Sequence, residues 1–316
     1  MSTGPLVSCI IVNYNTVDET TRFLDSLHRE TESIHAEIIV VDNGSRDDSV
    51  NALRNRFPTA QVVAAQRNLG FAKAVNLAAR RARGEYLLLL NPDMVALAGS
   101  VDALLDFAQS NPQYSIYGGR TVRSDGTLEP SSCWAAPTLW SLLMFATTLS
   151  TVFKRSPVFD PESMGGWQRD TCREVQIVTG CLLLIRRHLF HALGELDEDY
   201  FLYGEDAEFC LRARARGHRL VIVPTAEMVH EVGGSTGSGG EKTCMVLAGK
   251  VTMLRKVWPS GYAAIGTRLL YTGVATRALL ERLLRRSGPW SPAWLRRADW
   301  WAGYPAAKQS IFGIDD

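Results

Sequence analysis

Strand-like and helix-like segments alternate through the first 110 residues, and this alternation is the feature that most constrains the fold. Four short apolar runs have the pattern of buried strands: 7–12, 37–41, 61–65 and 86–90. A helical pattern follows each run. Strands joined by helices of about 10–14 residues predict an α/β fold with an open, mainly parallel sheet, flanking helices and right-handed crossovers.

Polar tripeptides follow three of these runs, at the sheet edge where open parallel sheets bind ligands. They are Asn13-Tyr14-Asn15, Asp42-Asn43-Gly44 and Asn91-Pro92-Asp93. The same residue types also form ordinary turns. Their coincidence at one edge nevertheless favours a binding site.

Two sequence patterns mark expected helix starts in this half of the chain. Thr16-x-x-Glu19 has the form of a capping box, in which side chains bond to the free backbone groups of a helix start. Ser45-x-x-Asp48 is expected to open the helix after the second strand. Both signals lie directly after the polar strand ends.

The first strand end lacks the glycine-rich loop of dinucleotide-binding proteins. A GxGxxG pattern is needed there, and the chain has NYNTVD instead. The sequence also contains no GxxxxGK[ST] phosphate loop. A nucleotide diphosphate would then need a divalent cation, and Asp93 offers the hard oxygen ligand that suits Mg²⁺ or Mn²⁺.

An acidic and aromatic stretch in the second half of the chain is its most informative part. The carboxylates of Glu205 and Asp206 open a helical pattern that Gly217 is expected to end, because glycine tolerates a left-handed cap. A short apolar strand follows at 220–223, and His230 comes after it. An ionised carboxylate at a helix start can act as a general base. Complementing the helix dipole is the alternative role for the pair.

Several stretches of the middle section allow two interpretations. Residues 137–153 carry no charge and are too short to span a membrane, so they form either a buried helix or an apolar flap. Residues 154–171 have the composition of a loop and the length of a lid. Gly180 interrupts a strand-like run, which indicates close approach of backbone or ligand. The glycine- and serine-rich residues 231–240 form an active-site loop or a plain linker.

The charge balance sets the C-terminal region apart. The whole chain has a net charge of +1, which argues against a general nucleic-acid binder. Residues 266–301 hold seven arginines, one aspartate and one glutamate, a local charge of +5, together with leucines and four tryptophans. Such a region suits peripheral contact with a membrane, or helices packed on the main domain.

Seven motifs occur in the order found in one enzyme family. They are VSCIIVNYN, IIVVDNGSRDDS, NLGFAKAVN, GEYLLLLNPDM, TGCLLLIRR, LDEDYFLYGEDAEFCLRARARGH, and His230 with Gly234-Ser235. With them, residues 6–256 resemble the family 2 inverting glycosyltransferases, and within that family the bacterial rhamnosyltransferase type. The resemblance implies a Rossmann-like GT-A fold, a nucleotide-diphosphate sugar donor and a metal ion, Mg²⁺ or Mn²⁺.

The resemblance also implies roles for single residues. Asp206 would be the catalytic base and Glu205 would support the acceptor site or local hydrogen bonds, with the order of these two roles left open. Asp93 would bind the metal ion, and His230 would bind the metal ion or the diphosphate. The nucleotide would be held by Tyr14, Asn15, Asp42, Arg67 and Asn68.

Three positions depart from the family pattern. The metal motif, usually Asp-x-Asp, has a single carboxylate at Asp93, which implies weaker or less direct metal contact. Glu208 stands where the subfamily often has aspartate. Val75 stands where other members have arginine, which removes a phosphate contact.

The expected activity is transfer of rhamnose from a dTDP donor to a glycan or polyprenyl-linked acceptor. The alternatives are a UDP-sugar donor, of galactose or N-acetylglucosamine type, and a non-catalytic nucleotide-sugar-binding protein.

Residues 1–258 would form the transferase domain, with a nucleotide-binding half (1–110) and an acceptor-binding half (111–258), and residues 259–316 a helical appendage. The N-terminus runs into a strand without a signal-peptide pattern. We therefore expect a cytoplasmic protein, peripheral at the inner face of the plasma membrane, that is compatible with homo-oligomers.

Overall fold

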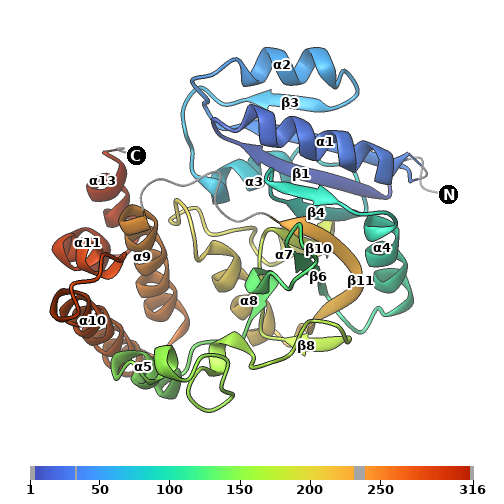
Figure 1. Ribbon diagram of the computed structural model, residues 1–316. Coiled ribbons are helices and arrows are strands. Elements are labelled where there is room, and N and C mark those ends of the chain that lie inside the picture. The colour runs from blue at the N-terminus through green and yellow to red at the C-terminus, as the bar shows by residue number, and fades with distance from the viewer. Residues whose placement is uncertain (1–3, 33, 231–238, 314–316) are drawn as a thin grey trace.

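A central sheet with helices on both faces forms the body of the molecule (Figure 1). The computed structural model describes residues 4–32, 34–230 and 239–313. Within these ranges the strands of the sheet follow in the order β3 (Gln61–Ala64), β2 (Ala36–Asp42), β1 (Val7–Asn13), β4 (Tyr86–Leu90), β10 (Leu182–Arg186), β6 (Ile116–Val122), β11 (Leu220–His230) and β5 (Met94–Ala96), and β8 (Arg173–Val175) pairs with β11.

Strand direction divides the sheet into two parts. The strands β3, β2, β1 and β4 are all parallel, as the alternating pattern predicted. β10 runs antiparallel between β4 and β6, β6 and β11 are parallel, and β5 and β8 run antiparallel to β11. The reversal at β10 was not predicted, because hydrophobic periodicity carries no information on strand direction.

Side chains alternate across the strands and bury a core on each face of the sheet. One face is covered by α1 (Val17–Thr31), α2 (Ser49–Arg56) and α4 (Ser100–Ser110). The opposite face is covered by α3 (Phe71–Ala79), α7 (Arg187–Ala192) and α8 (Glu205–Ala215). The helix that carries the acidic pair is therefore anchored on the sheet through Phe209, Cys210 and Ala213.

The helix start expected at Thr16 is confirmed without its capping bond, and the start expected at Ser45 is wrong. Thr16 precedes α1, but its hydroxyl donates to Asn13 Oδ1 (3.0 Å) and no capping bond forms. α2 begins at Ser49, and the Ser45 hydroxyl accepts a hydrogen bond from the backbone N–H of Asn15 (2.9 Å). Both hydroxyls therefore serve the strand ends, and this tertiary role overrides local capping.

The C-terminal helices pack around a hydrophobic core of their own. They are α9 (Gly239–Val257), α10 (Ser260–Leu283), α11 (Trp290–Leu295), α12 (Arg297–Trp301) and α13 (Ala306–Phe312). Trp300 is fully buried in their shared core, and Trp290, Trp294 and Trp301 are partly buried against it. The tryptophans therefore stabilise this layer, and the helices pack on the rest of the chain through contacts of α9 with α8 and of α10 with α5.

The charge-free stretch forms two short helices, α5 (Leu139–Ala146) and α6 (Leu149–Val152). Leu142 and Met144 are buried, whereas Trp140 and Leu143 are exposed, so the stretch is a half-buried helix pair beside α10. The expected motif Gly234-Ser235 lies outside the described residues. Among the helices that the structure describes, none has the length and apolar character needed to cross a membrane.

Candidate active site

The carboxyl ends of β1 and β2 meet in a hydrogen-bonded network. Asn13 Nδ2 donates to Asp42 Oδ2 (2.7 Å), and Asp42 Oδ1 accepts a bond from the backbone N–H of Ser45 (3.1 Å). Asp42 is buried, Asn15 binds the Ser45 hydroxyl, and Tyr14 lies exposed at the rim. Both oxygens of the Asp42 carboxylate are thus held in place at the sheet edge where ligands bind.

The loops after β2 and β3 are joined beside this network. Asn43 Nδ2 donates to Asn68 Oδ1 (2.9 Å), and Asn43 Oδ1 accepts a bond from the backbone N–H of Leu69 (2.9 Å). Gly44 has a φ of +78°, and an added Cβ would lie 2.5 Å from the carbonyl carbon of Arg67, so only glycine fits. The five residues expected to hold the nucleotide therefore lie along one edge, with Arg67 exposed.

Asp93 and His230 meet across β5 and β11. The antiparallel pairing sets Met94 opposite His230. This register brings the imidazole Nε2 within 3.4 Å of Asp93 Oδ1. That oxygen is buried and accepts no hydrogen bond from any described residue. The two residues expected to bind the metal thus lie together in the fold.

The second nitrogen of His230 faces Glu129, which no sequence pattern singled out. Glu129 Oε2 lies 3.3 Å from Nδ1, and the Ser131 hydroxyl lies 3.2 Å from the same atom. Glu129 is buried, and its carboxylate accepts bonds from the backbone N–H of Ser131 (3.1 Å) and the hydroxyl of Thr121 (3.4 Å). The imidazole is therefore flanked by two carboxylates, one on each nitrogen.

This arrangement sets the charge of the imidazole. Burial lowers the pKa of His230, but Asp93 and Glu129 outweigh burial and raise this pKa to about 9. Burial raises the pKa of Glu129, but the hydrogen bonds from His230 and Ser131 keep it below its ordinary value. The positive charge of the protonated imidazole offsets the negative charge of the carboxylates. A divalent cation at Nε2 of His230 would compete with the proton on that nitrogen.

Asp206 lies in the first turn of α8, at the other side of the strand ends. Its Oδ2 accepts a bond from the backbone N–H of Gly180 (2.9 Å) and its Oδ1 from that of Ala207 (2.7 Å). Burial raises the pKa of Asp206 above its ordinary value, and these two N–H groups offset only part of that rise. As predicted, α8 begins at the acidic pair and ends before Gly217, whose φ is +87°.

Glu205 differs from its neighbour because its side chain points into the interior. It is 4% exposed, and its Oε2 has no hydrogen-bond partner among the described residues. Burial and then the adjacent Asp206 carboxylate raise the pKa of Glu205 to about 8. This shift favours the protonated form of the Glu205 carboxyl.

Two consecutive residues, Gly180 and Cys181, connect the two sides of the site through their backbone, and we call them the backbone strip. The N–H of Gly180 binds Asp206, and the carbonyl of the next residue, Cys181, accepts a bond from the N–H of Asn91 (3.2 Å). Asn91 lies two residues before Asp93 on the same strand end. The proposed base and metal ligand are thus placed relative to one another through two consecutive residues.

The residues beside this strip complete the connection. The Thr179 hydroxyl donates to the backbone carbonyl of Ser131 (2.8 Å), whose side chain contacts His230. An added Cβ at Gly180 would lie 3.3 Å from the Phe71 ring. The sequence predicted an approach by backbone or ligand, whereas the groups nearest to this glycine are the side chains of Phe71 and Asp206.

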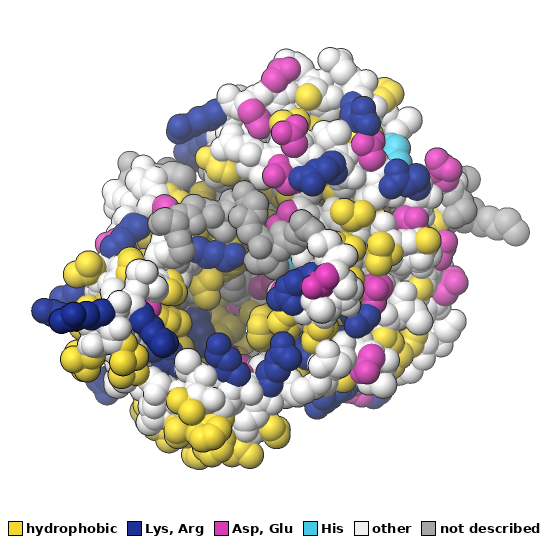
Figure 2. All heavy atoms as spheres, viewed as in Figure 1, with side chains coloured by type: hydrophobic (Ala, Val, Ile, Leu, Met, Phe, Trp, Pro, Cys, Tyr) yellow, Lys and Arg dark blue, Asp and Glu magenta, His cyan; other side chains and the backbone are white. Residues whose placement is uncertain are grey.

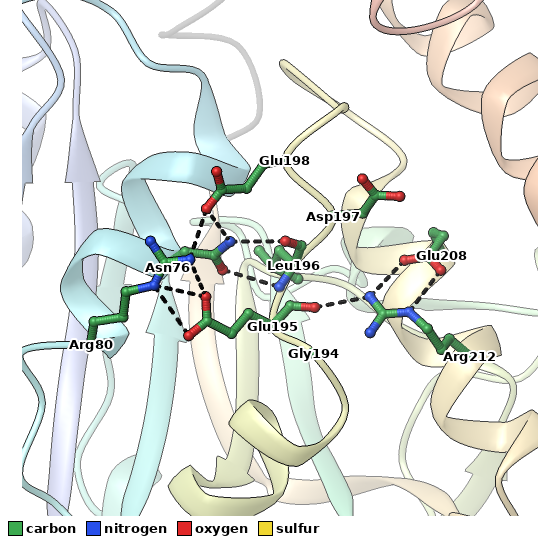
Figure 3. A pocket seen from close by; sticks show the side chains of 9 residues that line it. All are labelled: Asn76, Arg80, Gly194, Glu195, Leu196, Asp197, Glu198, Glu208 and Arg212. Carbon is green, nitrogen blue, oxygen red and sulfur yellow. Dashed lines mark hydrogen bonds and ion pairs between the residues drawn. The ribbon is translucent and has the colours of Figure 1, made fainter.

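A charged cavity of about 430 Å³ lies between α3, the loop before α8, and α8 itself (Figure 3). Asn76 Nδ2 donates to the carbonyl of Leu196 (2.8 Å), and Asn76 Oδ1 accepts a bond from the N–H of the same residue (3.0 Å). Arg80 forms an ion pair with Glu195 (2.6 Å). None of the residues expected in the site lines this cavity. Its side chains therefore brace the loop that leads into α8.

Two departures from the family pattern have a structural role. Glu208 is buried and binds Arg212 through two hydrogen bonds of 2.8 Å, in the same supporting network. Val75 lies buried in the core between α3 and the sheet. Neither side chain belongs to the polar strand ends.

One face of the molecule is hollowed between the C-terminal helices and the sheet, as Figure 2 shows. Lysine and arginine side chains border the lower side of this hollow. Positive charge beside an open hollow suits a ligand that carries phosphate groups.

Solved structures with the same architecture define the fold class. GalNAc-T7, solved with UDP, GalNAc and Mn²⁺, has a TM-score of 0.61 at 16% identity, over 88% of this chain and 51% of that one. The mannosyltransferase PcManGT from Pyrobaculum calidifontis, solved with GDP-Man and Mn²⁺, has a TM-score of 0.56 at 18% identity, over 99% of this chain and 89% of that one. The chain therefore has the GT-A glycosyltransferase fold.

Sequence comparison defines the family. The model of glycosyl transferase family 2 matches residues 8–193. The N-acetylglucosaminyl-diphospho-decaprenol L-rhamnosyltransferase of Mycobacterium tuberculosis (strain ATCC 25618 / H37Rv) is 30% identical over 247 residues, 72% of this chain and 76% of that protein. The O-antigen biosynthesis protein RfbC of Myxococcus xanthus is 28% identical over 229 residues, 72% of this chain and 17% of that protein. The chain belongs to glycosyl transferase family 2 and is a glycosyltransferase.

Proposed function

We propose that this glycosyltransferase inverts the anomeric centre as it transfers rhamnose from dTDP-rhamnose to a lipid-linked glycan. The observation that supports the proposal is the link through Gly180 and Cys181 between Asp206 and the strand end that carries Asp93, which faces His230. The rhamnosyltransferase activity of the mycobacterial relative on a decaprenol-linked sugar supports both the donor sugar and the acceptor class. Residues 1–110 would bind the donor and residues 111–258 the acceptor.

Asp206 is the proposed general base. An acceptor hydroxyl has a high pKa, so a carboxylate must take its proton as the glycosidic bond forms, which is worth roughly 10²–10⁴-fold. The N–H groups of Gly180 and Ala207 hold the carboxylate and favour its ionised form. Glu205, whose burial favours the protonated form, would support the acceptor side. Inversion requires the acceptor to attack from the side opposite the leaving diphosphate. The base and the diphosphate site must therefore lie on opposite sides of the sugar, and the backbone of Gly180 and Cys181 would keep them apart.

Asp93 and His230 are the proposed protein ligands of a divalent cation, Mg²⁺ or Mn²⁺. The buried Asp93 Oδ1 that faces the imidazole lacks a hydrogen bond in the described chain, and a cation would satisfy it. No group of three or more His, Cys, Asp and Glu side chains in the described ranges is arranged to hold a metal by itself. Diphosphate oxygens and water molecules would complete the coordination of the cation, as is usual for Mg²⁺ bound by few protein ligands. The bound cation would offset the negative charge of the leaving diphosphate.

Glu129 is the proposed positioning residue for His230. A carboxylate on Nδ1 orients the ring and leaves Nε2 directed at Asp93. Glu129 is suited to this task because Ser131 and Thr121 hold its own carboxylate.

The network at the ends of β1 and β2 is the proposed nucleotide site. Asp42, buried with both oxygens held, would bind the base, while Tyr14 and Asn15 line the rim and Arg67 and Asn68 lie near the nucleotide. Thermal unfolding with dTDP and with UDP would test the donor, since a ligand bound only by the folded state raises the melting temperature. A larger rise with dTDP supports the proposal, and a rise with UDP alone contradicts it.

We further propose that the enzyme works at the cytoplasmic face of the membrane as a peripheral protein, because a polyprenyl-linked acceptor resides there. A transfer assay with dTDP-rhamnose and an N-acetylglucosaminyl diphosphate lipid tests the whole proposal. Rhamnosylated lipid is the expected product. Transfer from a UDP-sugar only, or donor binding without any transfer, would contradict it.

A further inference from the structure

We propose that the outer side of α10, with the groove between α10 and α12, docks on an anionic phospholipid surface. This inference rests on the proposed function in one respect, which is that a lipid-linked acceptor is reached from the membrane surface. We call this surface the α10 face. It comprises Ile265, Arg268, Leu279, Arg282 and Leu283 of α10 and Arg286 just after its end, with Leu295 of α11 and Arg297 of α12 across the groove.

The α10 face exposes large apolar side chains to solvent. Leu279 is 56%, Leu283 68% and Leu295 78% exposed. Arg268, Leu279 and Leu283 lie on one side of α10, because Leu283 is four residues and Arg268 eleven residues, about three helical turns, from Leu279. Figure 2 shows hydrophobic side chains interleaved with lysine and arginine along the lower and left edges of the molecule, over α5, α10 and α11.

The charged side chains of the α10 face are all arginines. Glu281 accepts hydrogen bonds from the backbone N–H groups of Trp290 (3.2 Å) and Ser291 (2.7 Å) at the start of α11. Asp299 forms an ion pair with Arg296 (2.8 Å). The arginines of the α10 face are exposed. Leucines and arginines mixed on one helix surface are typical of an interfacial helix on anionic lipid.

The groove beside α10 adds a recess of suitable chemistry. A cavity of about 660 Å³ is lined by Arg268, Tyr271, Leu295, Arg297 and Trp301, among others. The Tyr271 and Trp301 rings meet edge to face at 5.0 Å and form an apolar wall. Two guanidinium groups beside an apolar wall fit the phosphate and the upper acyl region of a lipid.

A second copy of the chain fits this face less well. In a two-fold dimer the same patch meets itself, so the arginines of one copy would face those of the other. Like charges opposed in an interface disfavour association. An anionic bilayer offers the opposite charge, and it has an apolar interior for the leucines.

Vesicle co-sedimentation of the full chain tests the inference. We expect binding to phosphatidylcholine vesicles that contain about one third phosphatidylglycerol, and little binding to phosphatidylcholine alone. The double variant Arg282→Gln/Arg286→Gln should bind the anionic vesicles about 25-fold more weakly, since each arginine contributes about fivefold. Leu279→Ser/Leu283→Ser should also weaken binding, and added salt should weaken it for the wild type. The matched control is Arg22→Gln/Arg54→Gln, on α1 and α2, which should bind as the wild type does.

Separate readouts distinguish this inference from the proposed function. The α10-face variants should bind dTDP with unchanged affinity by calorimetry and should keep the wild-type melting temperature. Equal vesicle binding by the wild type and both α10-face variants would overturn the inference while leaving the enzyme assignment intact. A wild-type dimer that becomes a monomer in Leu279→Ser/Leu283→Ser would assign the face to a second copy instead. Competition by millimolar glycerol phosphate would indicate a site for soluble phosphate and would also overturn it.

Discussion

The backbone N–H of Gly180 donates a hydrogen bond of 2.9 Å to Asp206 Oδ2. The carbonyl of the following residue, Cys181, binds Asn91, which leads into Asp93. One peptide strip therefore sets the position of the proposed base and of the proposed metal ligand. Because β10 starts directly after this strip, the sheet itself holds the separation between the two sides of the site.

Gly180→Ala should lower kcat about tenfold while leaving the KM for dTDP-rhamnose unchanged. The added Cβ would lie 3.3 Å from the Phe71 ring, so the strip must shift by a few tenths of an ångström and misplace Asp206. Steady-state kinetics measure both constants. Gly261→Ala, where an added Cβ meets open space, is the control and should retain wild-type kcat. A fully active Gly180→Ala would contradict the positioning role.

Glu129→Gln should weaken Mn²⁺ binding about 10–100-fold, because an amide holds the His230 ring in place less firmly than a carboxylate does. Electron paramagnetic resonance of Mn²⁺ in the presence of dTDP measures this affinity without turnover. Glu227→Gln, which removes a half-buried carboxylate paired with Arg120, is the matched control and should leave the affinity unchanged. Unaltered Mn²⁺ affinity in Glu129→Gln would remove Glu129 from the site.

Glu205→Gln should stabilise the fold more at pH 8.5 than at pH 5. The folded-state pKa of Glu205 is raised from its ordinary value of 4.5 to about 8, so the folded protein binds a proton that the unfolded chain releases. The free energy of unfolding therefore falls as pH rises from the unfolded pKa to the folded pKa. Urea unfolding at several pH values measures the difference between variant and wild type. A difference that does not change with pH would show that Glu205 is ionised in the fold.

Asn76→Ala should lower the free energy of unfolding by about 2–4 kcal/mol, since it leaves the buried N–H and C=O of Leu196 without partners. Chemical denaturation measures the loss. Asn55→Ala, on the exposed side of α2, should change stability by less than about 0.5 kcal/mol. Loss of activity without loss of stability in Asn76→Ala would instead point to a direct role in the site.

The parallel half of the sheet and its polar edge were predictable from the sequence. Continuous apolar runs report burial on both faces, and helices between them force parallel pairing. The start of α8 at Glu205 was predictable for a similar reason, since acidic residues and a later glycine mark the two ends of a helix. These signals are local, and each can be read within about one helix length.

The remaining features depend on contacts between distant residues. Glu129 and His230 are separated by 101 positions, and a lone glutamate before a proline gives no signal of its partner. The antiparallel insertion of β10 depends on long-range pairing, and the burial of Trp300 depends on a core that joins the C-terminal helices, α5 and the loop before α8. The hydroxyls of Thr16 and Ser45 likewise serve neighbouring strand ends, so local capping rules predicted the wrong partner.

The most direct test of the account is the reaction of dTDP-rhamnose with an N-acetylglucosaminyl diphosphate lipid, followed by nuclear magnetic resonance of the product. The wild type should form a rhamnoside whose anomeric configuration is opposite to that of the donor. Asp206→Asn should bind dTDP normally but transfer about 10²–10⁴-fold more slowly. Asp102→Asn, exposed on α4, should match the wild type. A product with retained configuration, or near wild-type transfer by Asp206→Asn, would contradict the assignment of Asp206 as the base.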